Sequence, residues 1–225
     1  NGHYLAMNSA ASSLNTLATT SFHLSGLQMI HRTKELISKI QLDGDANYII
    51  NILQNIHSKV SNRPHKIFTA CSKDALKNKL EEFEASQANQ EQQLIDVTKS
   101  QIAWITGSQV CYCAQAFAGV AREHPDSAAL SVLATVLRNG FLHTAIREKG
   151  GAYGAGASND TATNTFKLFS YRDPKCKETF QAFEDAISWA KTSINEQHLE
   201  EAILGVVSSI DKPLSPVGEA KNDFN

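Results

Sequence analysis

One segment of the chain combines an arginine, a tyrosine and several glycines at a spacing that could bind a polar ligand. It reads Arg-Glu-Lys-Gly-Gly-Ala-Tyr-Gly over residues 147–154. We expect Arg147 in the last turn of a helix, because Gly150 and Gly151 can adopt positive φ and end a helix sharply. Tyr153 then begins an extended segment with small neighbours, which lets another backbone approach closely.

Two interpretations of this segment remain open from the residue types alone. Arginine and tyrosine both donate hydrogen bonds at neutral pH, so Arg147 and Tyr153 suit a peptide carbonyl and the oxyanion that it becomes. In the structural interpretation, Arg147 is placed by the helix dipole and Tyr153 is an ordinary packing residue.

The histidines and cysteines lack the spacing of a metal site. The eight histidines form neither a His-x-x-Glu-His nor a His-Glu-x-x-His string. Cys111 and Cys113 would share one face of a strand, but a tetrahedral site needs two more soft ligands. A cysteine nucleophile would need a histidine partner, which the sequence does not assign. We therefore predict no metal site in this chain and buried structural roles for Cys111 and Cys113.

Other ligand classes are disfavoured by the glycine pattern and by composition. The stretch from Gly154 to Gly156 lacks the third glycine of a dinucleotide loop, and it follows a helix, whereas such loops follow a strand. The chain has 225 residues, 42% hydrophobic and 20% charged, with a net charge of -2. This composition is typical of a soluble globular protein without a nucleic-acid footprint. No apolar run approaches the roughly 20 residues of a membrane span, so we expect no membrane partner.

The elements that must position the segment suggest an α+β fold. Periodicity predicts, in chain order, strands over 102–106 and 109–118, a helix over 125–147, a strand over 163–171, and helices beginning at 173 and 195. Such an order favours helices over one face of a mainly antiparallel sheet.

The first part of the chain has a different pattern. Residues 1–62 are expected to be mainly helical, and a strand over 66–71 and a helix follow. Residues 85–97 are polar and aperiodic, which predicts a linker between a domain over 1–84 and a domain over 98–225. The four cysteines do not resemble a disulfide framework, which favours a reducing compartment.

Three stretches carry a resemblance to a known family. They are His-Pro-Asp at 124–126, the string over 142–154, and Ser-Tyr-Arg-Asp-Pro at 170–174. Together they resemble the C-terminal half of the pitrilysin/insulinase zinc metallopeptidases, the inverzincins, within the presequence-protease-like branch. Residues 2–7 and 25–27 also fit the upstream part of that half, so the resemblance covers most of the chain.

The resemblance implies an architecture and site residues. The family has four homologous α+β sandwich domains in two halves, which close around a peptide-sized chamber. Residues 1–84 would be the C-terminal part of the third domain, and residues 98–225 a C-terminally truncated fourth. Arg147 and Tyr153 match the two positions that reach the substrate, and Gly154 adjoins them as a further substrate contact.

The resemblance also implies function, cofactor and partners. Zinc would lie in the N-terminal half of the full-length protein, outside this chain, so this chain alone would be an inactive fragment of a zinc-dependent endopeptidase. Its partners would be that N-terminal half and peptide substrates, in the cytoplasm or an organelle matrix. The alternative is a non-catalytic structural or partner subunit of the same fold.

Overall fold

The computed structural model describes residues 2–43, 46–62 and 100–224. These residues fall into two compact units, and each is considered by itself. The first consists of the described residues within 1–35 and 93–210, and the second of those within 36–92 and 211–225. The first unit contains the segment 147–154, whereas the predicted strand over 66–71 and the predicted linker over 85–97 lie outside the described residues.

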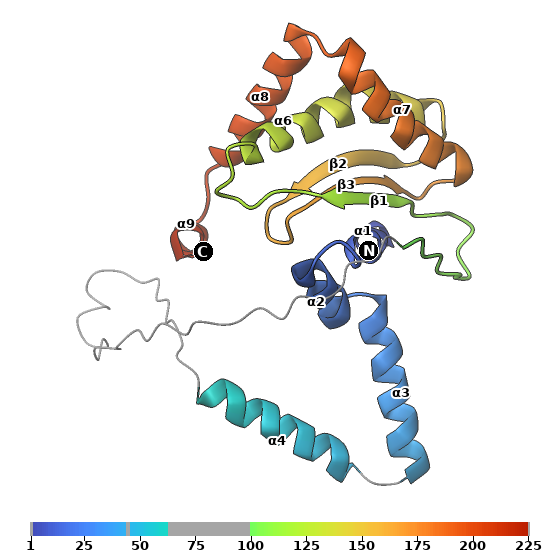
Figure 1. Ribbon diagram of the computed structural model, residues 1–225, viewed down its shortest axis with the longest axis vertical. Coiled ribbons are helices and arrows are strands. Elements are labelled where there is room, and N and C mark those ends of the chain that lie inside the picture. Colours follow the sequence, from blue (N-terminus) through green and yellow to red (C-terminus); the bar gives the residue numbers. More distant parts are fainter. Residues whose placement is uncertain (1, 44–45, 63–99, 225) are drawn as a thin grey trace, which may run out of the picture. The chain divides into compact units, whose positions relative to one another are not determined.

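The first unit is built on a sheet of three antiparallel strands. They are β1 (Ala114–Ala118), β2 (Gly154–Asp160) and β3 (Thr165–Tyr171). Among the described residues, β3 lies in the centre of the sheet, with β1 on one side and β2 on the other (Figure 1). Strands β2 and β3 form a hairpin in which Gly154 pairs with Tyr171 at the open end and Asp160 with Thr165 near the turn.

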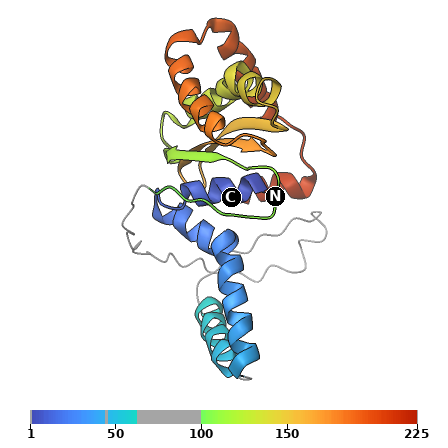
Figure 2. The same ribbon diagram turned by 90° about the vertical axis from the view of Figure 1, so that its right-hand side faces the viewer.

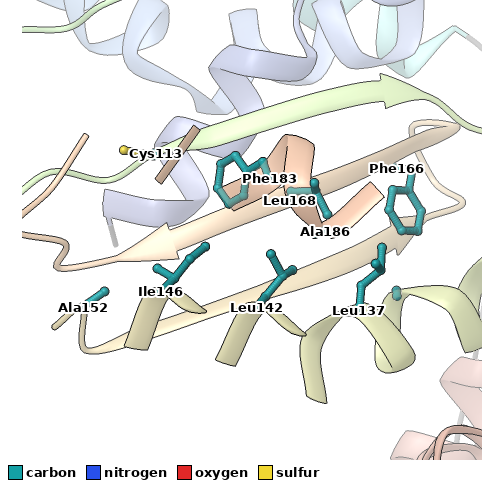
Figure 3. Close-up of a cluster of buried hydrophobic side chains, with 10 residues drawn as sticks. Cys113, Leu137, Leu142, Ile146, Ala152, Phe166, Leu168, Phe183 and Ala186 are labelled. Carbon is teal, nitrogen blue, oxygen red and sulfur yellow. The ribbon is translucent and has the colours of Figure 1, made fainter. Parts of the chain in front are cut away.

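One face of the sheet is covered by helices from the second half of the chain. They are α6 (Ser127–Leu137), η1 (Arg138–Glu148), α7 (Lys177–Ser193) and α8 (Glu196–Ile210). Figure 3 shows the core between the sheet and these helices, where Leu142, Leu168 and Phe183 are completely buried. The predicted helices are therefore present, although α7 begins at Lys177 and not at 173, because Asp173 pairs with Cys111. The antiparallel sheet covered by helices confirms the α+β fold class.

The opposite face of the same sheet is covered by α1 (Gly2–Ala11), which α2 (Thr16–Ser25) follows (Figure 2). The ring of His3 in α1 stacks on Phe169 and lies edge-on to Tyr171, with centroid distances of 5.6 and 5.1 Å. The Asn15 amide, at the N-cap of α2, donates to the Thr163 carbonyl in the hairpin turn at 2.9 Å. The expectation of helices over one face only was therefore wrong. The β3 residues on the opposite face include the aromatic side chains of Phe169 and Tyr171, and α1 covers them.

The predicted strands over 102–106 and 109–118 are only partly present. Residues 100–110 are irregular, and β1 begins at Ala114, after an isolated bridge between Cys111 and Asp173. Arg172, with a positive φ of 50°, interrupts the regular ladder just after β3 ends, and pairing resumes at the Cys111–Asp173 bridge. Within this irregular stretch, the Trp104 indole donates a hydrogen bond to Ser9 of α1 at 3.0 Å, so it is fixed by side chains instead of a second strand.

The helix over 127–148 is continuous and 22 residues long, so by length and composition alone it would pass as a membrane span. The sequence analysis did not expect a segment of this kind. Leu137, Leu142 and Ile146 along its length are buried in the core of the first unit. The core helix of a soluble protein can have the same length and apolar composition, so these two properties are weak evidence for a membrane span.

The remaining elements are helical. Helix α3 (Leu27–Asp43) begins in the first unit and ends in the second, and the second unit also contains α4 (Asn47–Ser61) and α9 (Pro216–Phe224). The helical character predicted for the first 62 residues is therefore confirmed over their described part. The division into a third and a fourth domain stays a prediction.

Candidate functional site

Two glycines fix the end of the helix that carries Arg147. Gly151 adopts a positive φ of 85°, as predicted, and its N–H donates to the Arg147 carbonyl at 3.0 Å. Gly150 is required for a different reason, because a Cβ there would lie 2.3 Å from the carbonyl oxygen of Ile146. The Ala152 N–H then donates to the same Ile146 carbonyl at 3.1 Å, which closes the turn and directs the chain into β2.

Arg147 lies in the last turn of η1, which is a π-helix and not an α-helix. Its side chain is exposed, and its Nη1 lies 3.0 Å from Nε2 of His143. The other ring nitrogen of His143, Nδ1, lies 3.3 Å from Oε1 of Glu148. Neither His143 nor Glu148 was predicted as part of the site. The i,i+4 spacing of His143 and Arg147 was visible, but the i,i+5 spacing of His143 and Glu148 brings side chains together only in a π-helix.

Tyr153 is held by its backbone and presents its side chain to solvent. Its N–H donates to the carbonyls of Tyr171 and Arg172, at 3.1 and 3.4 Å. Its ring lies edge-on to that of Tyr171, with centroids 5.5 Å apart, yet the residue is 68% exposed. Within this chain the Tyr153 ring therefore packs against Tyr171 alone among the aromatic rings that the structure describes.

Gly154 begins β2, which is an edge strand in the described part of the sheet. A Cβ at Gly154 would meet only the Cβ of Tyr171, at an ordinary distance of 3.9 Å. Packing within the chain therefore does not require glycine here. An edge strand with small residues leaves its backbone open to pairing with an extended peptide.

A buried carboxylate supports the chain segment next to Tyr153. Asp173 is completely buried, and its Oδ1 and Oδ2 accept hydrogen bonds from the Lys175 N–H and the Thr179 hydroxyl, at 2.9 and 2.7 Å. Its backbone exchanges two hydrogen bonds with Cys111, at 2.7 and 2.9 Å. The neighbouring Pro174 is the nearest group that a Cβ on Gly151 would meet. The positions of Tyr153 and the glycine turn thus depend on the same supported segment.

The described cysteines are poor candidates for chemistry. The sulfurs of Cys113 and Cys176 lie 3.9 Å apart. Burial and the neighbouring Cys176 raise the pKa of Cys113 to about 12. Cys111 is exposed, so the buried role predicted for it was wrong, although partial desolvation and Cys176 still raise the pKa of its thiol. Both thiols are therefore protonated at neutral pH and are weak nucleophiles. Among the residues that the structure describes, no group of three or more His, Cys, Asp or Glu side chains could hold a metal ion.

The fold and the site together define an α+β domain that presents an arginine and a tyrosine at a helix-to-strand turn, with no metal centre within its described residues. Comparison with known proteins places this arrangement in a family. Residues 52–206 match the family model of the peptidase M16 inactive domain. The match covers more than half of the chain, and the chain therefore belongs to this family.

Individual relatives extend the likeness over the whole chain. The mitochondrial presequence protease of Yarrowia lipolytica is 31% identical over 229 residues, covering 97% of this chain and 23% of the relative. That of Eremothecium gossypii is 30% identical over 244 residues, covering 100% and 24%. The mouse protein of the same name is 46% identical over 101 residues, covering 44% and 10%.

These matches confirm the predicted resemblance to the C-terminal region of presequence-protease-like members of the pitrilysin family. The chain spans between a tenth and a quarter of the length of the curated relatives that it matches. The relatives are mitochondrial, which agrees with the organelle matrix named in the sequence analysis.

Proposed function

We propose that this chain is the C-terminal, substrate-binding part of a zinc-dependent endopeptidase that degrades peptides in a closed chamber. In this proposal, Arg147 and Tyr153 contact the substrate and the oxyanion that forms from its scissile carbonyl. The observation that carries it is the state of Tyr153, whose backbone is fixed by hydrogen bonds while its side chain is 68% exposed.

The chemistry of the two side chains supports these roles. A phenol hydrogen bond becomes stronger as the carbonyl oxygen gains charge, and one such donor is worth about 3 kcal/mol in a transition state. The Arg147 guanidinium is a permanent cation with a planar set of donors, which suits a carbonyl or carboxylate group of a peptide. Gly154 would let the peptide backbone approach the β2 edge beside these donors.

The metal chemistry would come from outside this chain. The described residues offer no group that could hold zinc. In the proposal, zinc would be held by residues of the N-terminal half of the full-length protein, where it would supply Lewis-acid chemistry for amide hydrolysis. This chain binds and orients the peptide, and it is inactive without that half. Because the two sets of residues would lie on different halves, closure around the substrate would complete the site.

The names of the relatives point to substrates and a location. They are presequence proteases of mitochondria, so we propose mitochondrial presequence peptides as one substrate class and the mitochondrial matrix as the compartment. The N-terminal half and peptides would be the partners of this chain. Nucleic acids and membranes have no part in the proposal.

A second candidate is a structural or partner subunit without catalytic residues, which the description of the matched family as an inactive domain favours. The two candidates differ in what they expect of Tyr153. If the chain only supports the fold or binds a partner, loss of the Tyr153 hydroxyl should leave its function intact. If Tyr153 donates to the oxyanion, loss of the hydroxyl should lower peptide turnover.

Replacement of Tyr153 by phenylalanine in the full-length protein tests the proposal. Phenylalanine keeps the ring contact with Tyr171, so the melting temperature should change little. We expect kcat for a fluorogenic peptide to fall about 100-fold with little change in KM, because the lost hydrogen bond is strongest in the transition state. Turnover close to that of the wild type would remove the catalytic assignment and favour the structural subunit.

A further inference from the structure

The side chains of His143, Arg147 and Glu148 form one chain of polar contacts on the surface of η1. Arg147 Nη1 is 3.0 Å from His143 Nε2, and His143 Nδ1 is 3.3 Å from Glu148 Oε1. The π-helix makes this possible. In an α-helix, residues five apart would point about 140° away from each other, since one turn takes 3.6 residues. Here the i→i+5 register brings both Arg147 and Glu148 beside the same imidazole.

The contacts assign a protonation pattern to His143. An arginine side chain can only donate hydrogen bonds, so Nε2 of His143 accepts from Arg147. The proton of the neutral ring is therefore on Nδ1, which faces the carboxylate of Glu148. A carboxylate at this position favours the tautomer with its proton on Nδ1 and so keeps Nε2 free to accept. Glu148 and Arg147 thus lie against the two different ring nitrogens of His143.

We propose that His143, held in this tautomer by Glu148, is a positioning residue that presents the Arg147 guanidinium to the substrate. This inference rests on the proposed function of Arg147. A lone arginine side chain on a helix surface occupies many rotamers, and ordering it on binding carries an entropic cost. The contact with His143 restricts it before the substrate arrives, and it occupies Nη1 while leaving the other N–H groups of the guanidinium for a ligand.

The exposure of these groups separates positioning from folding. The His143 and Glu148 side chains are 40% and 55% exposed, and exposed polar contacts contribute little to stability. A structural role would therefore show itself in the melting temperature, and a positioning role only in the kinetics.

The experiment measures kcat and KM of the full-length protein with a fluorogenic peptide for His143→Ala, His143→Gln, Arg147→Ala and the double variant His143→Ala/Arg147→Ala. We expect kcat/KM to fall about tenfold in His143→Ala, less than the roughly 100-fold that a fixed misplacement of about 1 Å can cost, because Arg147 remains present and can still reach the substrate. The glutamine variant should recover most of the loss, because its amide can accept from Arg147 and donate to Glu148.

The double variant should be no worse than Arg147→Ala alone, since His143 acts only through that arginine. His31→Ala is the matched control, because His31 also contacts a glutamate on an exposed helix surface, with its Nε2 3.2 Å from Glu35 Oε1. This control should retain wild-type kinetics, and all variants should melt within a few degrees of the wild type.

The outcomes distinguish this inference from the function on which it rests. Unchanged kinetics in Arg147→Ala would overturn both. A large loss in Arg147→Ala with wild-type kinetics in His143→Ala would overturn the positioning role alone. A loss in His143→Ala that persists when Arg147 is already absent would also overturn it, because His143 would then act by another route.

Discussion

The two ends of the β2–β3 hairpin each carry a cluster of charged side chains, and the clusters differ in burial. Near the hairpin turn, Lys167 is 4% exposed and its ammonium lies 2.6 Å from Asp160 Oδ2. Arg147, His143 and Glu148 meet on the exposed surface of η1, the helix that leads through the glycine turn to the 68% exposed Tyr153 and the open end of the hairpin. The first cluster belongs to the folded state itself, whereas the second is accessible to a ligand. Charge at the turn should therefore govern stability, and charge at the open end should govern binding.

Loss of the carboxylate at the buried cluster should have the largest effect. Asp160→Asn leaves the buried Lys167 ammonium without its counter-ion, and removal of one partner of a buried pair costs about 3–5 kcal/mol. The Asp160 side chain is 29% exposed, so we expect the low end, about 3 kcal/mol, in the free energy of unfolding from urea titration.

Lys167→Met is the matched control for this prediction. The remaining Asp160 carboxylate is partly exposed and still accepts backbone N–H groups from Ala162 and Thr163, at 3.1 and 3.3 Å. We therefore expect a loss of only about 1 kcal/mol. An equal or larger loss in Lys167→Met would mean that burial of the ammonium is not the source of the effect.

The glycine turn at the open end should be the next most sensitive feature. Gly150→Ala would place a Cβ 2.3 Å from the Ile146 carbonyl oxygen, so the backbone must shift, at a cost of about 2 kcal/mol. Gly151→Ala meets nothing closer than Pro174 Cγ at 3.6 Å and bears only the strain of its φ of 85°, about 1 kcal/mol. Unfolding free energies in this order would support the steric account, and the reverse order would contradict it.

The buried cluster should also make stability depend on pH in the acid range. Burial alone would raise the pKa of Asp160, but hydrogen bonds from Lys167 and Thr163 and the charge of Lys167 lower it below its ordinary value. A carboxyl group with a lowered folded-state pKa contributes stability that is present above its unfolded pKa, about 3.9, and is lost as pH falls through the folded value.

The difference in unfolding free energy between wild type and Asp160→Asn measures this effect. We expect it to stay constant above about pH 5 and to shrink as pH falls through and below about 3.9, because the wild type loses there the contribution that the variant lacks. A difference that stays constant over this range would show that the Asp160 carboxylate is not responsible.

Much of the open end could be predicted from the sequence, because its determinants are local. A run of inward-facing apolar residues and two glycines specify where the helix ends, and alternation specifies β3. The cover provided by α1 could not be predicted in this way. It joins His3 to Phe169 and Tyr171, far apart in the chain, and alternation along β3 does not reveal that the face bearing Lys167 is also covered.

The remaining differences have two further causes. The strand expected over 102–106 has suitable residues, but a strand also needs a partner, and within the described residues the pairing of this segment with the chain after β3 extends no further than the bridge between Cys111 and Asp173. The contacts of Arg147 depend on the π-helical register, which changes which residues are neighbours without changing the apolar pattern that predicts a helix. Sequence therefore identified Arg147 and Tyr153 as candidates but not the side chains that hold Arg147.

The smallest effect on stability is expected at the exposed cluster of His143, Arg147 and Glu148. This prediction tests directly whether that cluster contributes less to stability than the buried pair of Asp160 and Lys167. Glu148→Gln removes the carboxylate 3.3 Å from His143, which would cost a few tenths of a kcal/mol at an exposed site. The same change removes a negative charge from a helix C-terminus, where the dipole disfavours it by about 0.3–1 kcal/mol. These two effects have opposite signs, so we expect the unfolding free energy to change by less than about 0.5 kcal/mol in urea titration. A loss above about 1 kcal/mol would show that the exposed cluster also stabilises the fold, and it would contradict the proposed difference from the buried pair of Asp160 and Lys167.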